Sequence, residues 1–235
     1  MNPNKTSGRV AVITGGFGAL GQVVVAAAIE HGFNVAVLGH TAPAGLAERL
    51  GPNALLLGGV DLADEVAATT AMGMVVSRFG RIDALLNIAG GFRWIKIEDS
   101  RSADLEFLFR MNVQTTANAV RAALPALKGS PAARIVNVGA LAAEKATAGM
   151  GPYAASKAAV LRLTEALAEE LKDAGVTVNA VLPSIIDTAQ NRADMPKADF
   201  SRWVVPADLA EVMLFLASEK ARAVTGALIA VRGRV

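Results

Sequence analysis

The 235-residue chain is long enough for one α/β domain and too short for two large ones. Its formal net charge is only +2 and its basic residues are scattered, which argues against a nucleic-acid partner. The absence of cysteine excludes thiol catalysis, disulfides and thiolate metal sites, and we expect no metal site. Residues 1–8 are polar and no apolar run reaches membrane-spanning length, so we expect a cytoplasmic protein with no membrane partner.

Short apolar strands alternate with helices along the whole chain. Strands are predicted at residues 9–14, 34–38, 54–57, 82–87, 133–138, 176–182 and 227–231. Helices are predicted up to residue 31 and at 44–50, 61–79, 102–127, 153–173 and 209–217, with Asp61 as an N-cap. This order predicts a doubly wound α/β fold, a seven-stranded parallel sheet with helices on both faces. No repeat or linker interrupts it, so residues 1–235 are expected to form a single domain.

A glycine-rich turn follows the first predicted strand. Gly15, Gly16, Gly18 and Gly21 lie between that strand and the helix after it. Bare backbone N–H groups and a helix N-terminus bind phosphate in this context, so we expect a nucleotide there. The alternative is a tight turn without a ligand.

Residues 184–206 form the longest stretch with no predicted element. It contains two prolines, mixed charges and the apolar side chains Met195, Phe200 and Trp203. Such a loop in a compact domain is typical of a lid over a substrate. Its cations could meet an anionic substrate, although a solvated loop surface explains them as well.

Tyr153 and Lys157 are spaced to share one face of a helix. A phenol has an ordinary pKa of about 10, and an adjacent ammonium should lower it and make Tyr153 a usable proton donor. Tyr153 is also the only tyrosine. The alternative is an ordinary helix with a packed tyrosine and a solvated lysine.

Several ordered motifs resemble those of the short-chain dehydrogenase/reductase family over essentially the whole chain. The glycine turn resembles TGxxxGxG with Ala19 at one glycine position, and residues 87–90 resemble NNAG with Ile88 at the second asparagine. Tyr153 and Lys157 match YxxxK, and residues 183–188 resemble PGxIxT with Ser184 at the glycine. The resemblance implies a Rossmann fold, an NAD(P)-dependent oxidoreductase, and a homodimer or homotetramer acting on a small-molecule substrate.

The resemblance also assigns roles to residues. It makes Tyr153 and Lys157 catalytic, with Asn112 as a proton-relay residue. The cofactor-binding residues that it implies are Gly15, Phe17, Gly18, Ala19, Leu20, Gly21, Gly39, His40, Thr41, Asp61, Leu62, Asn87, Ala89, Gly90, Tyr153, Lys157, Pro183, Ile186 and Thr188. At the end of the second strand, Gly39 replaces the acidic residue that would repel a 2′-phosphate, so we favour NADP over NAD.

One departure bears on the substrate. The serine that the family usually places upstream of the tyrosine is Ala140, which cannot donate a hydrogen bond. Dihydropteridine reductases of the family also lack this serine, and the amino-acid sequence of the predicted lid looks similar to theirs. We therefore expect an electron-poor substrate such as quinonoid dihydropteridine beside Ala140, with Phe92, Trp94 and Trp203 as pocket walls. A carbonyl reductase with Thr147 or a backbone N–H in place of the serine, and a catalytically silent NAD(P)-binding sensor, remain the alternatives.

Overall fold

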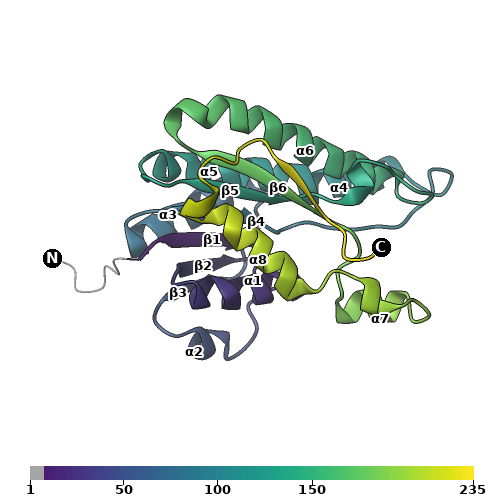
Figure 1. Cartoon of the computed structure of the whole chain (residues 1–235), viewed down its shortest axis with the longest axis horizontal. Coiled ribbons are helices and arrows are strands. Elements are labelled where there is room, and N and C mark those ends of the chain that lie inside the picture. The colour runs from purple at the N-terminus through teal and green to yellow at the C-terminus, as the bar shows by residue number, and fades with distance from the viewer. Residues whose placement is uncertain (1–7) are drawn as a thin grey trace.

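The computed structural model describes residues 8–235, so the prediction for residues 1–7 lies outside the described part. One parallel sheet of seven strands has the order β3-β2-β1-β4-β5-β6-β7 (Figure 1). The strands are β1 (Val10–Thr14), β2 (Asn34–Leu38), β3 (Ala54–Leu57), β4 (Ala84–Asn87), β5 (Arg134–Val138), β6 (Thr177–Pro183) and β7 (Leu228–Val231). The predicted strands are confirmed to within two residues at each end.

Helices cover both faces of the sheet. The α-helices of the described residues are α1 (Ala19–Glu30), α2 (Leu46–Leu50), α3 (Glu65–Phe79), α4 (Ser102–Phe109), α5 (Thr115–Lys128), α6 (Gly151–Leu171), α7 (Ala189–Asp194) and α8 (Pro206–Ala217). Helices α1 and α8 share one apolar core with the sheet, whereas α3, α5 and α6 share the other. Successive residues of β1 alternate between these cores, because neighbouring side chains on a strand point to opposite faces. This explains why the strand sequences are almost continuously apolar.

The start of α3 differs from the prediction. The helix begins at Glu65, and its N-cap is Asp64, which accepts a hydrogen bond from Ala67 N at 2.8 Å. Asp61 instead closes a turn ahead of the helix, where its carboxylate accepts from Ala63 N at 2.9 Å. Both aspartates are good caps by residue type, and the intervening turn delays the helix by three residues.

Two other long segments are less uniform than predicted. The helix predicted at 102–127 is interrupted by a π-helical turn, Arg110–Gln114, between α4 and α5. The predicted lid at 184–206 contains α7 and a 3₁₀ turn, Phe200–Arg202, and is therefore not irregular throughout.

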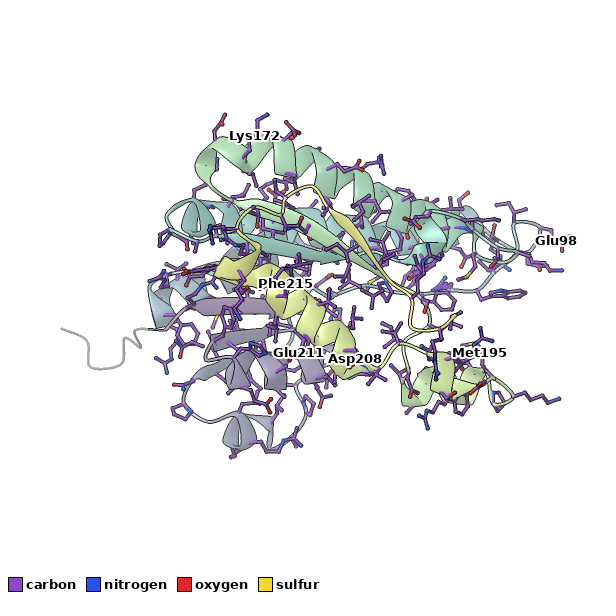
Figure 2. The ribbon with its side chains drawn as sticks, in the orientation of Figure 1. Glu98, Lys172, Met195, Asp208, Glu211 and Phe215 are labelled. Carbon is purple, nitrogen blue, oxygen red and sulfur yellow. The ribbon has the colours of Figure 1, made fainter. Side chains whose placement is uncertain are left out.

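The strand order reverses between β1 and β4, and ligands of doubly wound sheets bind beyond the carboxyl ends of the strands at such a point. The loop after β4 and the segment after β6 both extend from that edge. Figure 2 shows Glu98 of the first and Met195 of the second at the same end of the molecule. Among residues 8–235, no helix is long and apolar enough to cross a membrane.

Candidate active site

The glycine turn brings bare backbone to the end of β1. Gly15 has a φ of +64°, which favours glycine, and a Cβ added there would lie 2.7 Å from Ala89 N. A Cβ on Gly21 would overlap the Gly15 carbonyl oxygen, so α1 packs against the turn only because residue 21 is glycine. Gly18, the N-cap of α1, has no side chain to occupy the first amide donors of the helix. Gly16 N and Gly18 N donate to Leu38 O and Gly15 O, so the donors that the turn offers to an anion are the first amides of α1.

Thr14 ties this turn to the end of β4. Its Oγ1 accepts hydrogen bonds from Ile88 N at 3.1 Å and from Ala89 N at 3.2 Å. The side chain is buried. Two loops that flank the strand switch point are thereby held together.

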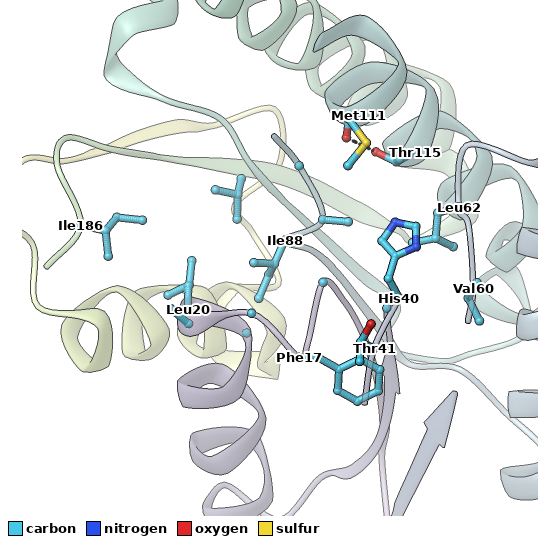
Figure 3. Close-up of a pocket in the computed structure, with 18 residues that line it drawn as sticks. Phe17, Leu20, His40, Thr41, Val60, Leu62, Ile88, Met111, Thr115 and Ile186 are labelled. Carbon is cyan, nitrogen blue, oxygen red and sulfur yellow. Dashed lines mark hydrogen bonds between the residues drawn. The ribbon is translucent and has the colours of Figure 1, made fainter. Parts of the chain in front are cut away.

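A cavity of about 520 Å³ opens over these strand ends (Figure 3). Thirteen of the predicted cofactor residues line it: Gly15, Phe17, Gly18, Ala19, Leu20, Gly21, Gly39, His40, Thr41, Leu62, Ala89, Gly90 and Ile186. Five further lining residues lie outside the predicted set: Val60, Ile88, Met111, Thr115 and Val138. Four of the five are next to a predicted site residue in the sequence or end a strand, and this position could have identified them as lining residues. The position of Thr115 in the cavity wall could not be predicted, since the direction of its side chain depends on the π-helical turn just before it.

Phe17 and Gly39 meet at one end of this cavity. A Cβ added to Gly39 would lie 2.8 Å from Phe17 Cδ2, so the phenylalanine ring fills the space that a side chain at position 39 would need. His40 and Thr41 follow on the cavity wall, and Figure 3 shows them above the Phe17 ring. The described residues that line this cavity include no Asp, Glu, Lys or Arg.

Asp61 lies beside the same end but pairs with a cation. Arg110 Nη2 contacts its carboxylate at 2.6 Å, and Asp61 is not among the cavity-lining residues. Its pKa lies below the ordinary value although burial opposes the shift, because Ala63 N and Arg110 donate hydrogen bonds to the carboxylate. The predicted contact of Asp61 with a cofactor stays a prediction.

The other predicted cofactor residues make protein contacts. Asn87 is buried, and its Nδ2 donates to Asn137 Oδ1 at 2.9 Å. Pro183 ends β6 and is buried. Thr188 caps α7 by accepting from Asn191 N at 3.2 Å. None of these three lines the cavity as described above.

Tyr153 and Lys157 both lie in α6, as predicted. The pKa of Tyr153 does not shift in the expected direction. Lys157 is 6% exposed, and its Nζ donates to the Val138 carbonyl at 2.8 Å. Burial raises the pKa of Tyr153 to about 12 and lowers the pKa of Lys157 to about 8. The expectation that the ammonium lowers the Tyr153 pKa is wrong, because desolvation of the phenolate dominates.

Asn112 lies at the centre of the π-helical turn and is buried. Its Oδ1 accepts from Gly91 N at 2.9 Å, while its Nδ2 donates to Gly91 O at 3.0 Å and to Ser156 Oγ at 2.9 Å. A Cβ on Gly90 would lie 2.6 Å from Asn112 Oδ1 and 3.3 Å from Lys157 Nζ. The predicted relay residue and the predicted catalytic lysine therefore flank one point of the loop after β4. The role of Asn112 in proton relay stays a prediction.

The predicted substrate residues are only partly brought together. The Phe92 ring packs edge-on against Tyr153, with 4.9 Å between centroids, and Phe92 is 55% exposed. Trp94 is also exposed and lies on Gly149, in the loop before α6. Ala140 is buried next to that loop. Trp203 differs, because it is 5% exposed and its ring packs against Phe200, with 4.7 Å between centroids. Its role as a pocket wall stays a prediction.

Comparison with known proteins decides the family. The family model described as "short chain dehydrogenase" matches residues 9–199. The chain belongs to the short chain dehydrogenase family. It is 30% identical over 250 residues to 2-(S)-hydroxypropyl-CoM dehydrogenase 3 of Xanthobacter autotrophicus, covering 98% of this chain and 97% of the relative. It is 29% identical over 236 residues to the 3-oxoacyl-[acyl-carrier-protein] reductase FabG of Vibrio harveyi, covering 96% of each.

A solved structure described as "ElxO with NADP Bound" shares the fold of this short chain dehydrogenase. The TM-score is 0.87 at 24% identity, and the match covers 96% of this chain and 98% of that one. The predicted Rossmann fold and the prediction of an NAD(P)-dependent oxidoreductase are thus confirmed. The relatives are varied dehydrogenases and reductases, and they do not show the dihydropteridine reductase subtype.

Proposed function

We propose that this short chain dehydrogenase is an NADPH-dependent reductase of a flat, electron-poor substrate, with quinonoid dihydropteridine as the first candidate. The observation that carries the proposal is the buried methyl group of Ala140, at the family position of a hydrogen-bond donor. The exposed Phe92 ring, which packs on Tyr153, supplies an aromatic wall beside the proposed proton donor. An electron-poor ring accepts a hydride with less help from a hydrogen-bond donor than a simple ketone, whose carbonyl group must be polarised. The aromatic wall suits a flat ring.

The residues that line the cavity fit a dinucleotide. The first amides of α1, directly after the glycine turn, suit a pyrophosphate, and apolar Val60 and Leu62 suit an adenine ring. Lys157 would hold the nicotinamide ribose, and Ile186 would line the nicotinamide end. When bound, a reduced nicotinamide supplies a hydride.

Tyr153 would supply the proton. With a pKa of about 12 it carries its proton at neutral pH, as a proton donor must. Lys157, with a pKa of about 8, is still mostly cationic at pH 7 and would stabilise the phenolate that forms when the proton leaves. Asn112 would hold the loop after β4 in place beside Lys157 through its bonds to Gly91.

The preference for NADPH is supported by the Phe17–Gly39 contact. An acidic side chain at position 39 would bind the ribose diol and repel a 2′-phosphate, and the Phe17 ring leaves no room for one. His40 and Thr41 are polar groups on the wall nearby.

A carbonyl reductase is the second candidate, because the relatives include 3-oxoacyl-[acyl-carrier-protein] reductases of Vibrio harveyi and Thermotoga maritima. Thr147 is exposed in the loop before α6 and could replace the missing hydroxyl, as could a backbone N–H. A silent sensor is the third candidate.

One experiment separates the three candidates. Oxidation of NADPH is followed by absorbance with quinonoid dihydropteridine, with a 3-oxoacyl thioester and with a simple ketone, in the parent, Tyr153→Phe and Ala140→Ser. We expect turnover of the pterin by the parent, and a gain of roughly 10²-fold for the ketone in Ala140→Ser, the usual scale for one such donor. Ready turnover of the thioester or ketone by the parent, without the pterin, would establish the second candidate. Cofactor binding without turnover in any variant would establish the sensor.

An assembly of identical subunits is also proposed. Leu105 and Phe109 of α4 are large apolar side chains that remain exposed, at 36% and 39%. Burying them against a second copy would remove apolar surface from water. Light scattering coupled to size-exclusion chromatography measures the subunit number, and a monomer at micromolar concentration would contradict the proposal.

A further inference from the structure

The segment after β7, residues 232–234, has no part in the function proposed above and is called the latch segment here. It begins beside Ser184, which stands where the family pattern has glycine. Ser184 Oγ donates to the Arg232 carbonyl at 2.6 Å, and Ser184 N donates to the Val231 carbonyl at 3.0 Å. The hydroxyl therefore has a defined partner, and that partner is the first residue of the latch segment.

The latch segment makes a second set of bonds to residues 201–202 of the predicted lid. Arg202 Nε and Nη2 donate to the Arg234 carbonyl at 2.9 and 2.7 Å. In return, Arg234 N donates to Arg202 O at 2.8 Å, and Arg234 Nη2 donates to Ser201 O at 2.6 Å. Each of the two segments thus donates hydrogen bonds from an arginine to backbone carbonyl groups of the other.

Gly233 allows the two segments to approach this closely. Its φ of +59° lies in the left-handed region, and an added Cβ would lie 2.7 Å from Arg202 O and 3.1 Å from the Trp203 carbonyl carbon. Any side chain at this position would strain the backbone and push the latch segment away from the lid.

The latched part of the lid leads directly to the cavity. Val204 N donates to Ile185 O and Asp187 N donates to Val204 O, both at 2.8 Å, and Ile186 and Val204 form a parallel bridge. Ile186 lines the cavity on the side away from His40 (Figure 3). Residues 232–234 therefore connect to the cavity wall through two layers of backbone hydrogen bonds.

One ion pair extends the connection to the other side of the site. Arg232 Nη2 lies 3.5 Å from Glu144 Oε2, in the segment between Ala140 and α6. Figure 1 shows the end of the chain at the same end of the molecule as α7.

We propose that the latch segment is a positioning element that fixes residues 184–206 against the sheet and so sets the place of Ile186 in the cavity wall. Ser184, Arg202 and Gly233 are the positioning residues. The latch itself stands on the hydrogen bonds described above, and only its effect on cofactor affinity rests on the function proposed above.

The test measures hydrogen exchange and kinetics in Ser184→Ala and Gly233→Ala. In the cofactor-free protein we expect the amides of Asp187 and Val204 to exchange about tenfold faster, because the lid opens locally more often. The KM for NADPH should rise about threefold to tenfold while kcat changes less than about twofold, as expected when binding rather than chemistry is affected. Ser184→Thr, which keeps the hydroxyl, should restore slow exchange.

Ser218→Ala is the matched control, since Ser218 Oγ also donates to a backbone carbonyl, that of Phe215 at 2.7 Å, at the end of α8. Exchange at Asp187 and Val204 that is equal in Ser184→Ala and Ser218→Ala would overturn the proposal. If Gly233→Ala does not fold, Arg202→Met removes the guanidinium bonds and gives the same readout. Faster exchange without any NADPH turnover would uphold the latch and contradict the proposed reductase.

Discussion

The Phe17 ring occupies the space above Gly39, where a Cβ would lie 2.8 Å from the ring. An acidic side chain introduced at position 39 alone therefore collides with the ring before it can reach a ribose. We predict that Gly39→Asp loses NADPH affinity without gaining NADH affinity. The double variant Phe17→Ala/Gly39→Asp should shift the ratio of kcat/KM for NADH over NADPH by about tenfold or more, a non-additive effect of contacting residues. Phe17→Ala is the control. An equal shift in the single Gly39→Asp variant would contradict this account.

The buried Lys157 ammonium predicts the alkaline limit of activity. Its pKa is lowered to about 8 by desolvation, whereas that of Tyr153 is raised to about 12. If the cation stabilises the forming phenolate, kcat/KM for reduction should fall above about pH 8, since this quantity reports ionisations of the free enzyme. A profile that stays flat to pH 10 would remove Lys157 from this role.

The same lysine should make stability depend on pH. Its folded pKa of about 8 lies below its ordinary value, so the unfolded chain binds more protons between those values and stability rises as pH rises through that window. The shift corresponds to at most about 3 kcal/mol. Lys157→Met should abolish this rise between pH 7 and pH 10. Urea unfolding at both values measures it, and an unchanged rise in the variant would contradict the assignment.

Thr14→Val removes the hydroxyl that joins the glycine turn to the end of β4. The amides of Ile88 and Ala89 then lose their acceptor inside the protein. We expect a loss of about 0.5–1.5 kcal/mol in the free energy of unfolding, the usual net contribution of a hydrogen bond, because the two amides are only partly buried. Thr14→Ser keeps the acceptor and serves as the control. Equal losses in both variants would point to packing of the methyl group instead.

The strands could be read from the sequence because the five inner strands are buried on both faces and the two edge strands, β3 and β7, are still rich in apolar residues. The cofactor cavity followed from the glycine turn and from strand ends, which meet at one edge of a parallel sheet. Helix starts were harder, since Asp61 and Asp64 are equally good caps by residue type.

Burial accounts for what the sequence could not predict at Tyr153 and Lys157. Spacing alone showed that the two share a helix, but only the fold shows that Lys157 turns to the Val138 carbonyl and that both groups are desolvated. Ser184 is a further case, because its partner Arg232 lies 48 residues along the chain.

The π-helical turn at Arg110–Gln114 carries one residue more than an ordinary helical turn would hold. This surplus residue changes the rotational phase between α4 and α5 by about 100°, the angle of one helical residue. The continuous helical segment from α4 to α5 can therefore direct Asn112 to the loop after β4 and still bury Ala119 and Val120 against the sheet. Deleting a single residue of this turn, such as Val113, would restore a regular α-helix, in which only one of these two sets of side chains could keep its orientation.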